Sequence, residues 1–225
     1  KVVAEDYGEQ IEKLPEPQKG VVEVVLRLKP SASLRGVVIA EGVPVPGATV
    51  TLTTGNRPGG GVSFRNGRFD DYGRGQVVTT DAAGEFVLSS PPETGTALAV
   101  AESGFGSAPI QQVRDSGRLV LQAFGRIEGT FKVAGQPVAG QEFLFSMMNV
   151  GISFDFAGYK ATTDEAGHFA ISKVPPGEGQ IVRLVKTSGN SWMHSHNTDV
   201  VVEPGKTTQV ALGDTGAVLK GHVSF

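Results

Sequence analysis

Apolar and polar residues alternate along short stretches of this chain. Residues 48–53 read ATVTLT, so that every second side chain is apolar, and Phe143 and Phe145 alternate in the same way further along. A period of two places one face of a strand against a core. The runs at 179–187 and 198–204 have the composition of further strands, and no segment shows a sustained helical period with capping residues. The pattern predicts an all-β protein.

Two stretches of the chain are near copies of each other. TTDAAGEF occupies Thr79–Phe86 and TTDEAGHF occupies Thr162–Phe169, an offset of 83 residues. The segments that precede them, Ser33–Leu52 and Gly125–Phe145, also match, with glycine, proline and glycine at equivalent positions and an offset of 93 residues. The difference between the two offsets places an insertion in the first repeat, at 55–76.

The repeats predict a tandem organisation. Residues 32–124 form a first whole repeat that includes the insertion, and residues 125–214 form a second. Residues 1–31 resemble the closing part of a preceding repeat, and residues 215–225 resemble the first strand of a following one. Self-similarity at a fixed period is typical of an array of modules, so we expect this sequence to be a window from a longer array.

The duplicated motif predicts a tight turn. Asp81 stands where its carboxylate accepts hydrogen bonds from the following main-chain N–H groups, and Gly84 stands where a chain leaving a type I turn needs a positive φ. Asp164 and Gly167 hold the same positions in the second repeat. Such a turn closes a β-hairpin, so we assign these four residues structural roles and no chemistry.

Both repeats carry the sequence pattern of a known domain family. GVPVPGATVTL followed by VVTTDAAGEFVLSSPP, and AGQPVAGQEFLF followed by KATTDEAGHFAISKVPPGEGQIVRLV, resemble carboxypeptidase regulatory-like domains. The resemblance implies tandem seven-stranded β-sandwiches of the transthyretin-like or prealbumin-like type, within the broad Ig-like architecture. It also implies modules without catalytic residues, in large bacterial envelope proteins. No histidine is followed three residues later by glutamate, so the resemblance indicates the accessory domain and not the peptidase.

Composition narrows the functional classes. The 225 residues include 31 glycines, 13 prolines and no cysteine. This suits strands joined by tight turns, and it excludes disulfides, thiol catalysis and cysteine-ligated zinc. The net charge of −3, with no long basic run, argues against nucleic acid as a partner. The sequence lacks an apolar stretch of the roughly 18 residues that a membrane span needs, so we expect no membrane insertion of this segment.

His194 and His196 are the best metal candidates, with Asp199 nearby. Alternate residues of a strand point to the same side, so both imidazoles can reach one ion. Two ligands and a third at most are few for a metal site, and a solvent-facing polar strand explains the same residues. We therefore predict no metal and no cofactor.

The insertion at 55–76 is the first candidate for a binding surface. Its arginines and aromatic residues can clamp anions or stack on planar groups, and its Asn66-Gly67 pair can close an extra hairpin. A second candidate is the segment 189–197, where an exposed Trp192 can stack on a sugar ring, although the same side chain can simply cover the end of a sandwich. The candidate binding residues are Arg57, Phe64, Arg65, Arg68, Tyr72 and Trp192.

The sequence shows no nucleophile–base pair and no paired acids, so we predict that the segment is not an enzyme. The leading hypothesis is a spacer, display or protein-interaction segment of a larger bacterial protein in the periplasm, at the cell surface or secreted. Its partners are then other domains of the same polypeptide. Two alternatives stay open: a glycan- or peptide-binding module that uses 55–76 or 189–197, and an accessory domain of an attached peptidase.

Overall fold

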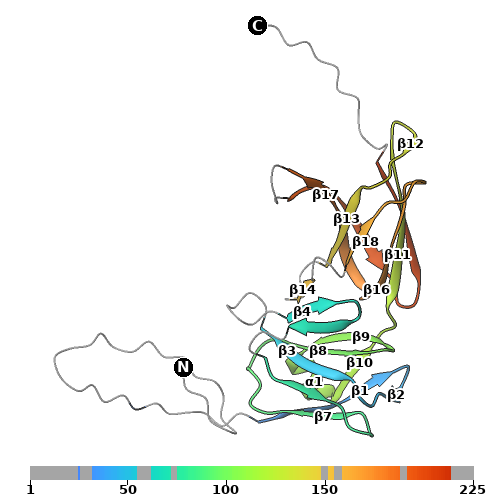
Figure 1. Ribbon diagram of the computed structural model, residues 1–225. Coiled ribbons are helices and arrows are strands. Elements are labelled where there is room, and N and C mark those ends of the chain that lie inside the picture. The colour runs from blue at the N-terminus through green and yellow to red at the C-terminus, as the bar shows by residue number, and fades with distance from the viewer. Residues whose placement is uncertain are drawn as a thin grey trace, which may run out of the picture. The chain divides into compact units, whose positions relative to one another are not determined.

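The computed structural model describes residues 25, 32–54, 62–71, 75–147, 152–154, 159–187 and 192–213. Contacts divide the chain into two compact units (Figure 1). The partial repeats predicted at 1–31 and 215–225 lie outside the described residues, apart from Val25. Unit 1 consists of residues 1–63, 68–122 and 150–153, and unit 2 of residues 64–67, 123–149 and 154–225.

Unit 1 is a sandwich of two sheets. In one sheet the first strand, β1, pairs antiparallel with β7 and β2 and parallel with the last strand, β10. The second sheet has the order β6-β3-β8-β9. The bounds are β1 (Leu34–Ala40), β2 (Val43–Pro44), β3 (Thr49–Thr53), β6 (Val77–Thr79), β7 (Glu85–Leu88), β8 (Thr96–Ala101), β9 (Gly104–Pro109) and β10 (Arg118–Leu121).

The core of unit 1 contains the alternating apolar residues predicted from the sequence. Val50 on β3 and Val38 on β1 are fully buried and belong to one cluster that draws on both sheets. The threonine face of β3 is buried as well, and the hydroxyl of Thr51 donates to the carbonyl oxygen of Gln76 at 2.9 Å. Hydrogen bonding of this kind allows a polar side chain to be buried at little cost.

A short helix, α1 (Ile110–Ser116), stands between β9 and β10, where the sequence indicated no helix. Its buried residues, Ile110 and Val113, belong to the core cluster of unit 1. It ends at Gly117, which has a left-handed φ of +66° and whose N–H donates to the carbonyl oxygen of Val113 at 2.8 Å. Two turns are too short to produce a sustained helical period. No helix in the described part of the chain has the length and apolar character to cross a bilayer.

The described part of the insertion in the first repeat contains a hairpin. β4 (Val62–Arg65) and β5 (Arg68–Asp71) are joined by Asn66 and Gly67, whose φ values are +47° and +79°. Two consecutive residues with positive φ are typical of the type I′ turn that Asn-Gly favours, so the predicted extra hairpin is confirmed. β14 (Ile152–Phe154) pairs with β4 and completes a three-stranded sheet.

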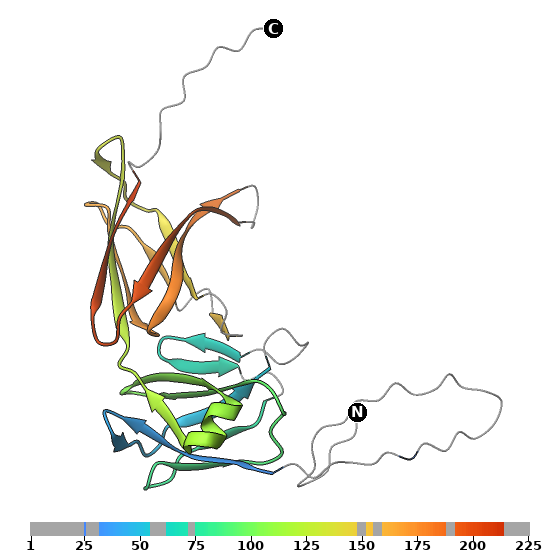
Figure 2. The ribbon, with the colours of Figure 1, turned by 180° about the vertical axis from the view of Figure 1, so that it is seen from behind.

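Unit 2 repeats the pairing scheme of unit 1, so the described structure is all-β with two β-sandwich bodies (Figure 2). β11 pairs antiparallel with β16 and parallel with β19, as β1 does with β7 and β10. The order β15-β13-β17-β18 of the second sheet matches β6-β3-β8-β9. The bounds are β11 (Gly125–Val133), β12 (Gln136–Pro137), β13 (Glu142–Met147), β15 (Lys160–Thr162), β16 (His168–Val174), β17 (Gly177–Lys186), β18 (Trp192–Val202) and β19 (Thr207–Gly213).

An aromatic cluster fills the core of unit 2. Phe143 stacks on Phe169 with ring centroids 4.8 Å apart, and its ring meets that of Phe131 edge-on at 5.3 Å. All three rings are buried, and Tyr159 is fully buried beside Phe145. Burial of an aromatic side chain of this size contributes about 2–3 kcal/mol, so these rings hold the two sheets of the unit together.

The duplicated motif forms the same turn in both units. Oδ1 of Asp81 accepts hydrogen bonds from two following main-chain N–H groups at 2.9 Å each. Oδ1 of Asp164 does the same at 2.9 and 2.8 Å. Gly84 and Gly167 both have φ of +75°, a left-handed conformation that glycine adopts without strain. The two aspartates of the duplicated motif therefore stabilise a hairpin turn, as predicted from the sequence.

Candidate functional site

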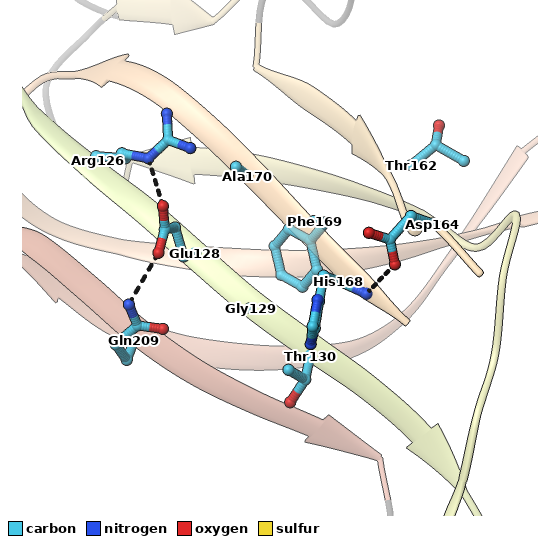
Figure 3. Close-up of a pocket in the computed structure, with 10 residues that line it drawn as sticks. All are labelled: Arg126, Glu128, Gly129, Thr130, Thr162, Asp164, His168, Phe169, Ala170 and Gln209. Carbon is cyan, nitrogen blue, oxygen red and sulfur yellow. Dashed lines mark hydrogen bonds and ion pairs between the residues drawn. The ribbon is translucent and has the colours of Figure 1, made fainter. Parts of the chain in front are cut away.

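An open hollow lies on the outer face of the β16–β11–β19 sheet in unit 2 (Figure 3). Its volume is about 490 Å³. Every second residue of β11 points outward here, because Ile127 and Phe131 point into the core. The hollow is lined by Arg126, Glu128, Gly129, Thr130, Thr162, Asp164, His168, Phe169, Ala170 and Gln209.

Hydrogen bonds tie the charged groups of the hollow to one another. Nε of Arg126 donates to Oε1 of Glu128 at 2.7 Å, and Nε2 of Gln209 donates to Oε2 at 3.0 Å. Nη1 of Arg126 also donates to Oγ of Ser172 at 2.6 Å. The hydrogen bond from Arg126, followed by that from Gln209, lowers the pKa of Glu128 below its ordinary value of 4.5. Glu128 is therefore an anion at neutral pH with both oxygens engaged.

The far end of the hollow contains Asp164 and His168. Figure 3 shows the Asp164 carboxylate beside the first residue of β16, where the main-chain N–H of His168 donates to Oδ1 at 2.8 Å. This carboxylate orders the turn, while the imidazole of His168 is exposed and lies next to Thr130. Within the described ranges, no group of three or more histidine or acidic side chains is placed to hold a metal ion.

The hollow is suited to contact with a polar surface. A catalytic pocket typically encloses its ligand in a mostly apolar cavity with a few convergent polar groups. Here the lining is an open strand face with hydroxyl, amide and charged groups. A general base at neutral pH needs a pKa near 7, and the pKa of Glu128 moves in the opposite direction. The arrangement offers hydrogen-bond donors and acceptors, and it offers no activated base at Glu128.

Trp192 lies at the start of β18, on the second sheet of unit 2. Its side chain is 38% exposed. The ammonium of Lys160 is 4.8 Å from the centroid of the indole ring, within the range of a cation–π contact. The same ammonium forms an ion pair with Glu142. Trp192 therefore packs over a charged pair of the sheet, as expected of a side chain that covers the sandwich. Part of its surface stays in solvent, as stacking on a sugar ring would require.

The histidine pair does not lie on one face through strand alternation. The pairing of β18 with β17 skips His196, which has a φ of +53°. An extra residue of this kind is a β-bulge, and a bulge interrupts the alternation of side chains. The sequence argument that His194 and His196 point to the same side therefore does not hold. The carboxylate of Asp199 accepts a hydrogen bond from Gln180 at 2.7 Å instead.

Phe64, a candidate from the insertion, is buried in unit 2. It is fully covered and stacks on Tyr159 with ring centroids 6.0 Å apart and 11° between the ring planes. Val62, two residues earlier on β4, is also fully buried. Phe64 is therefore a core residue, and a ligand cannot reach it at the surface.

The polar candidates of the insertion are distributed differently. Arg68 on β5 is exposed and Arg65 on β4 is half-buried. Arg57 and Tyr72 lie outside the described residues. A binding role for 55–76 thus stays a prediction that rests, within the described part, on Arg68 and Arg65.

The sequence did not single out Arg126, Glu128 and Gln209. A signal was present, because the polar residues at 126, 128 and 130 alternate with apolar or small residues along the strand. Alternation shows that these side chains share a face. Alternation does not show that Gln209 lies beside Glu128, because the two residues are 81 positions apart in the sequence. The parallel pairing of β11 with β19 brings them together.

Comparisons with known proteins find structural likenesses and assign no family. No family model matches the sequence, and no curated protein does. Among solved structures, the chain is similar to the minor pilin GBS52 of Streptococcus agalactiae, with 17% identity, a TM-score of 0.44, and coverage of 87% of this chain and all of the pilin chain. The resemblance to carboxypeptidase regulatory-like domains therefore stays an interpretation.

Two further similar structures are pilins as well. The major pilin subunit BcpA of Bacillus cereus is 18% identical over 74% of this chain and 59% of its own, with a TM-score of 0.33. The shaft pilin SpaA of Lactobacillus rhamnosus GG is 11% identical over 84% of this chain and all of its own, with a TM-score of 0.27. At these identities and TM-scores the likeness assigns neither a family nor a role to the chain.

Proposed function

We propose that the chain is a non-enzymatic spacer and display segment of a larger extracytoplasmic bacterial protein, with other domains of the same polypeptide as its partners. The observation that carries this proposal is the placement of the terminal strands. In each repeat the strand that opens the described sandwich, β1 or β11, is the neighbour of the strand that closes it, β10 or β19, and the two run parallel.

Parallel terminal strands advance the chain by the length of the module. In unit 2, β11 begins at Gly125 and β19 ends at Gly213, which pairs with Lys132. The chain therefore enters at one end of the sandwich and leaves at the other, roughly 20 Å away at about 3.3 Å per residue. β1 and β10 have the same relationship in unit 1. A spacer requires this geometry, because each module adds to the distance between its flanking segments.

The chemistry of the hollow supports a role without catalysis. Its carboxylate Glu128 is held by Arg126 and Gln209, and its second carboxylate, Asp164, is held by the hairpin turn. Both acidic groups of the hollow are thus engaged in structural hydrogen bonds.

The proposal is tested by displaying the full chain between a surface anchor and an epitope tag. We expect antibody access to the tag to be the same for the parent chain and for Arg126→Ala and Trp192→Ala, because neither side chain sets the length of a module. An unrelated flexible linker of equal residue number is the control. Access that depends on either side chain would show that the segment works through binding and not through spacing.

Partial exposure of Trp192 supports a second candidate function, glycan binding. A tryptophan combines a large flat apolar face with a polar N–H, and 38% of this one is open to solvent. Lys160 and the exposed His194 lie on the same sheet and offer hydrogen-bond donors. The combination suits a sugar ring that stacks on the indole.

A glycan array separates the two candidates. For glycan binding we expect a defined set of sugars to be retained by the full chain and lost in Trp192→Ala. Met193→Ala is the matched control, because Met193 is the next residue of β18 and is 54% exposed. Absence of any sugar that discriminates between these two variants would remove the glycan hypothesis and leave the spacer.

A further inference from the structure

The ladder between β11 and β19 is longer than its counterpart in unit 1. It runs through seven residue pairs, from Arg126 opposite Thr207 to Lys132 opposite Gly213. The ladder between β1 and β10 has four, from Val37 opposite Arg118 to Ala40 opposite Leu121. Hydrogen bonds in a parallel pair are evenly spaced, so the longer ladder contains more of them.

Tension along the polypeptide acts on this ladder in shear. Force enters unit 2 at Gly125 and leaves it beyond Gly213, at opposite ends of two neighbouring strands. The strands can slide apart only if the hydrogen bonds between them break together. Force applied to the same end of both strands would instead open the bonds one after another.

We infer that the β11–β19 ladder is a force-bearing clamp, which makes the second module withstand more tension than the first. The inference rests on the proposed spacer function, because a spacer held at both ends carries tension.

Contacts across the ladder add to its resistance to sliding. A Cβ at Gly213 would overlap the carbonyl oxygen of Lys132, so the two main chains meet closely at the end of the ladder. A Cβ at Gly129 would lie 2.7 Å from Cγ2 of Val210, so that side chain occupies the space above this glycine. The hydrogen bond from Gln209 to Glu128 joins the same two strands on the outer face.

Unit 1 has a smaller set of bonds in line with the force. Its four-pair ladder is supplemented by Gln122 and Phe105, which exchange two main-chain hydrogen bonds at 2.9 and 3.0 Å. These two bonds reduce the difference between the modules in the number of main-chain hydrogen bonds that resist tension. The ladder of unit 2 remains longer, so we expect unit 1 to yield first when the whole chain is stretched.

The first experiment changes the direction of force by moving one of two attachment points. The chain contains no cysteine, so paired cysteines provide unique attachment points for single-molecule pulling on the full chain. Ala123→Cys with Ala211→Cys loads the ladder in shear, and Ala123→Cys with Thr207→Cys loads the same end of both strands. All three positions are exposed, and the two proteins share one attachment site.

We expect the rupture force in the shear arrangement to be severalfold higher than in the same-end arrangement. Equal forces in the two arrangements would overturn the clamp. Both variants substitute exposed residues only, so we expect both to fold like the parent chain. Coincident circular dichroism spectra would show that a difference in rupture force does not arise from a loss of folding.

The second experiment removes one bond from the ladder. The N–H of Arg126 donates to the carbonyl oxygen of Lys206 at 3.0 Å, which fixes the hydrogen-bond pattern of the ladder. In a parallel pair, alternate residues of each strand direct their N–H groups toward the partner strand. The N–H of Val210 therefore faces β11, and that of Ala211 faces away. Val210→Pro therefore removes a ladder donor, and Ala211→Pro is the matched control with the same ring on the same strand.

Stretched from end to end, the parent chain should show two ruptures of unequal force. Val210→Pro should lower the higher one markedly, and Ala211→Pro should lower it less. If both prolines lower the lower rupture, the assignment of the strong event to unit 2 is wrong. The display assay reads spacing and the pulling assay reads force, so either hypothesis can fail while the other survives.

Discussion

The hydroxyl of Thr163 donates a hydrogen bond of 2.7 Å to the carbonyl oxygen of Val138. The same oxygen, Oγ1, accepts a hydrogen bond from the main-chain N–H of Gln141 at 2.9 Å. Thr80 makes both contacts in unit 1, to Val45 at 2.7 Å and from Ala48 at 2.8 Å. The second threonine of the duplicated motif thus joins the turn to the loop that leads into β13 in unit 2, and to the equivalent loop before β3 in unit 1.

Thr163→Val should destabilise unit 2 by about 1–3 kcal/mol. The substitution keeps the shape of a side chain that is 4% exposed, and it leaves one half-buried donor, the N–H of Gln141, and one half-buried acceptor, the carbonyl oxygen of Val138, without this partner. Urea unfolding followed by circular dichroism measures the change. Thr163→Ser retains the hydroxyl and should recover most of the loss. A loss for serine as large as that for valine would contradict this, because it would show that the methyl group contributes as much as the hydroxyl with its two hydrogen bonds.

Gly167→Ala should cost more stability than Gly135→Ala. The two glycines have φ of +75° and +76°, so both substitutions carry the same conformational cost of about 1 kcal/mol. A Cβ at Gly167 would lie 2.5 Å from the carbonyl oxygen of Phe131, whereas a Cβ at Gly135 meets nothing within 4 Å. We expect an additional loss of about 1–2 kcal/mol at Gly167, measured by thermal unfolding. Equal losses would mean that the hairpin shifts freely away from β11.

Glu128→Gln should remove a part of the acid sensitivity of unit 2. The pKa of Glu128 is lowered in the folded protein by Arg126 and then Gln209, so its contribution to stability is present above its ordinary pKa of 4.5 and is lost as the pH falls through the lower folded value. The parent protein should lose stability more steeply below about pH 4.5 than the variant does. Glu178→Gln, at an exposed glutamate of β17, is the control, and its stability profile should follow that of the parent.

Tyr159 should give unit 2 a weakness at high pH. Burial raises the pKa of its phenol above the usual value of 10.0, against the smaller opposite effect of the hydrogen bond from the N–H of Gly67. The folded state therefore keeps the proton, and stability declines as the pH rises above about 10, where the unfolded phenol ionises.

The difference in ultraviolet absorbance between the parent protein and Tyr159→Phe reports this single phenol. We expect its ionisation to coincide with unfolding and not to precede it. At neutral pH the phenylalanine variant should be less stable by about 1 kcal/mol, because it loses the hydrogen bond to the carbonyl oxygen of Lys173. Ionisation at an ordinary pKa in the folded protein would contradict the burial of this ring.

The sequence was sufficient for the features that depend on neighbouring residues. Alternation located β3, and Asn66-Gly67 located the hairpin of the insertion, because strand period and turn conformation are local properties. The duplicated turn followed from Asp164 and Gly167 for the same reason. These elements are specified by one or two side chains whose partners lie within a few positions.

The sequence was insufficient where pairing between distant strands decides. Phe64 lies beside arginines in the sequence and was therefore predicted to contact a ligand. Alternation places it on the same face of β4 as Val62, but only the assembled structure shows that this face is buried. The bulge at His196 separates it from the regular register of β18 and leaves no mark in composition. The network of Arg126, Glu128 and Gln209 exists because β11 and β19 are neighbours, which only the assembled sheet establishes.

The end-to-end course of each module also bears on how such a protein can change over generations. A duplication that inserts one more copy between existing copies leaves the entry and exit of every old copy as they were, because each copy takes the chain in at one end and releases it at the other. The length of the array can then increase by one module at a time, while the sequence of each module changes independently of the others. The β4–β5 hairpin (Val62–Asp71), which lies within the insertion of the first repeat, is a change of this kind, confined to one copy.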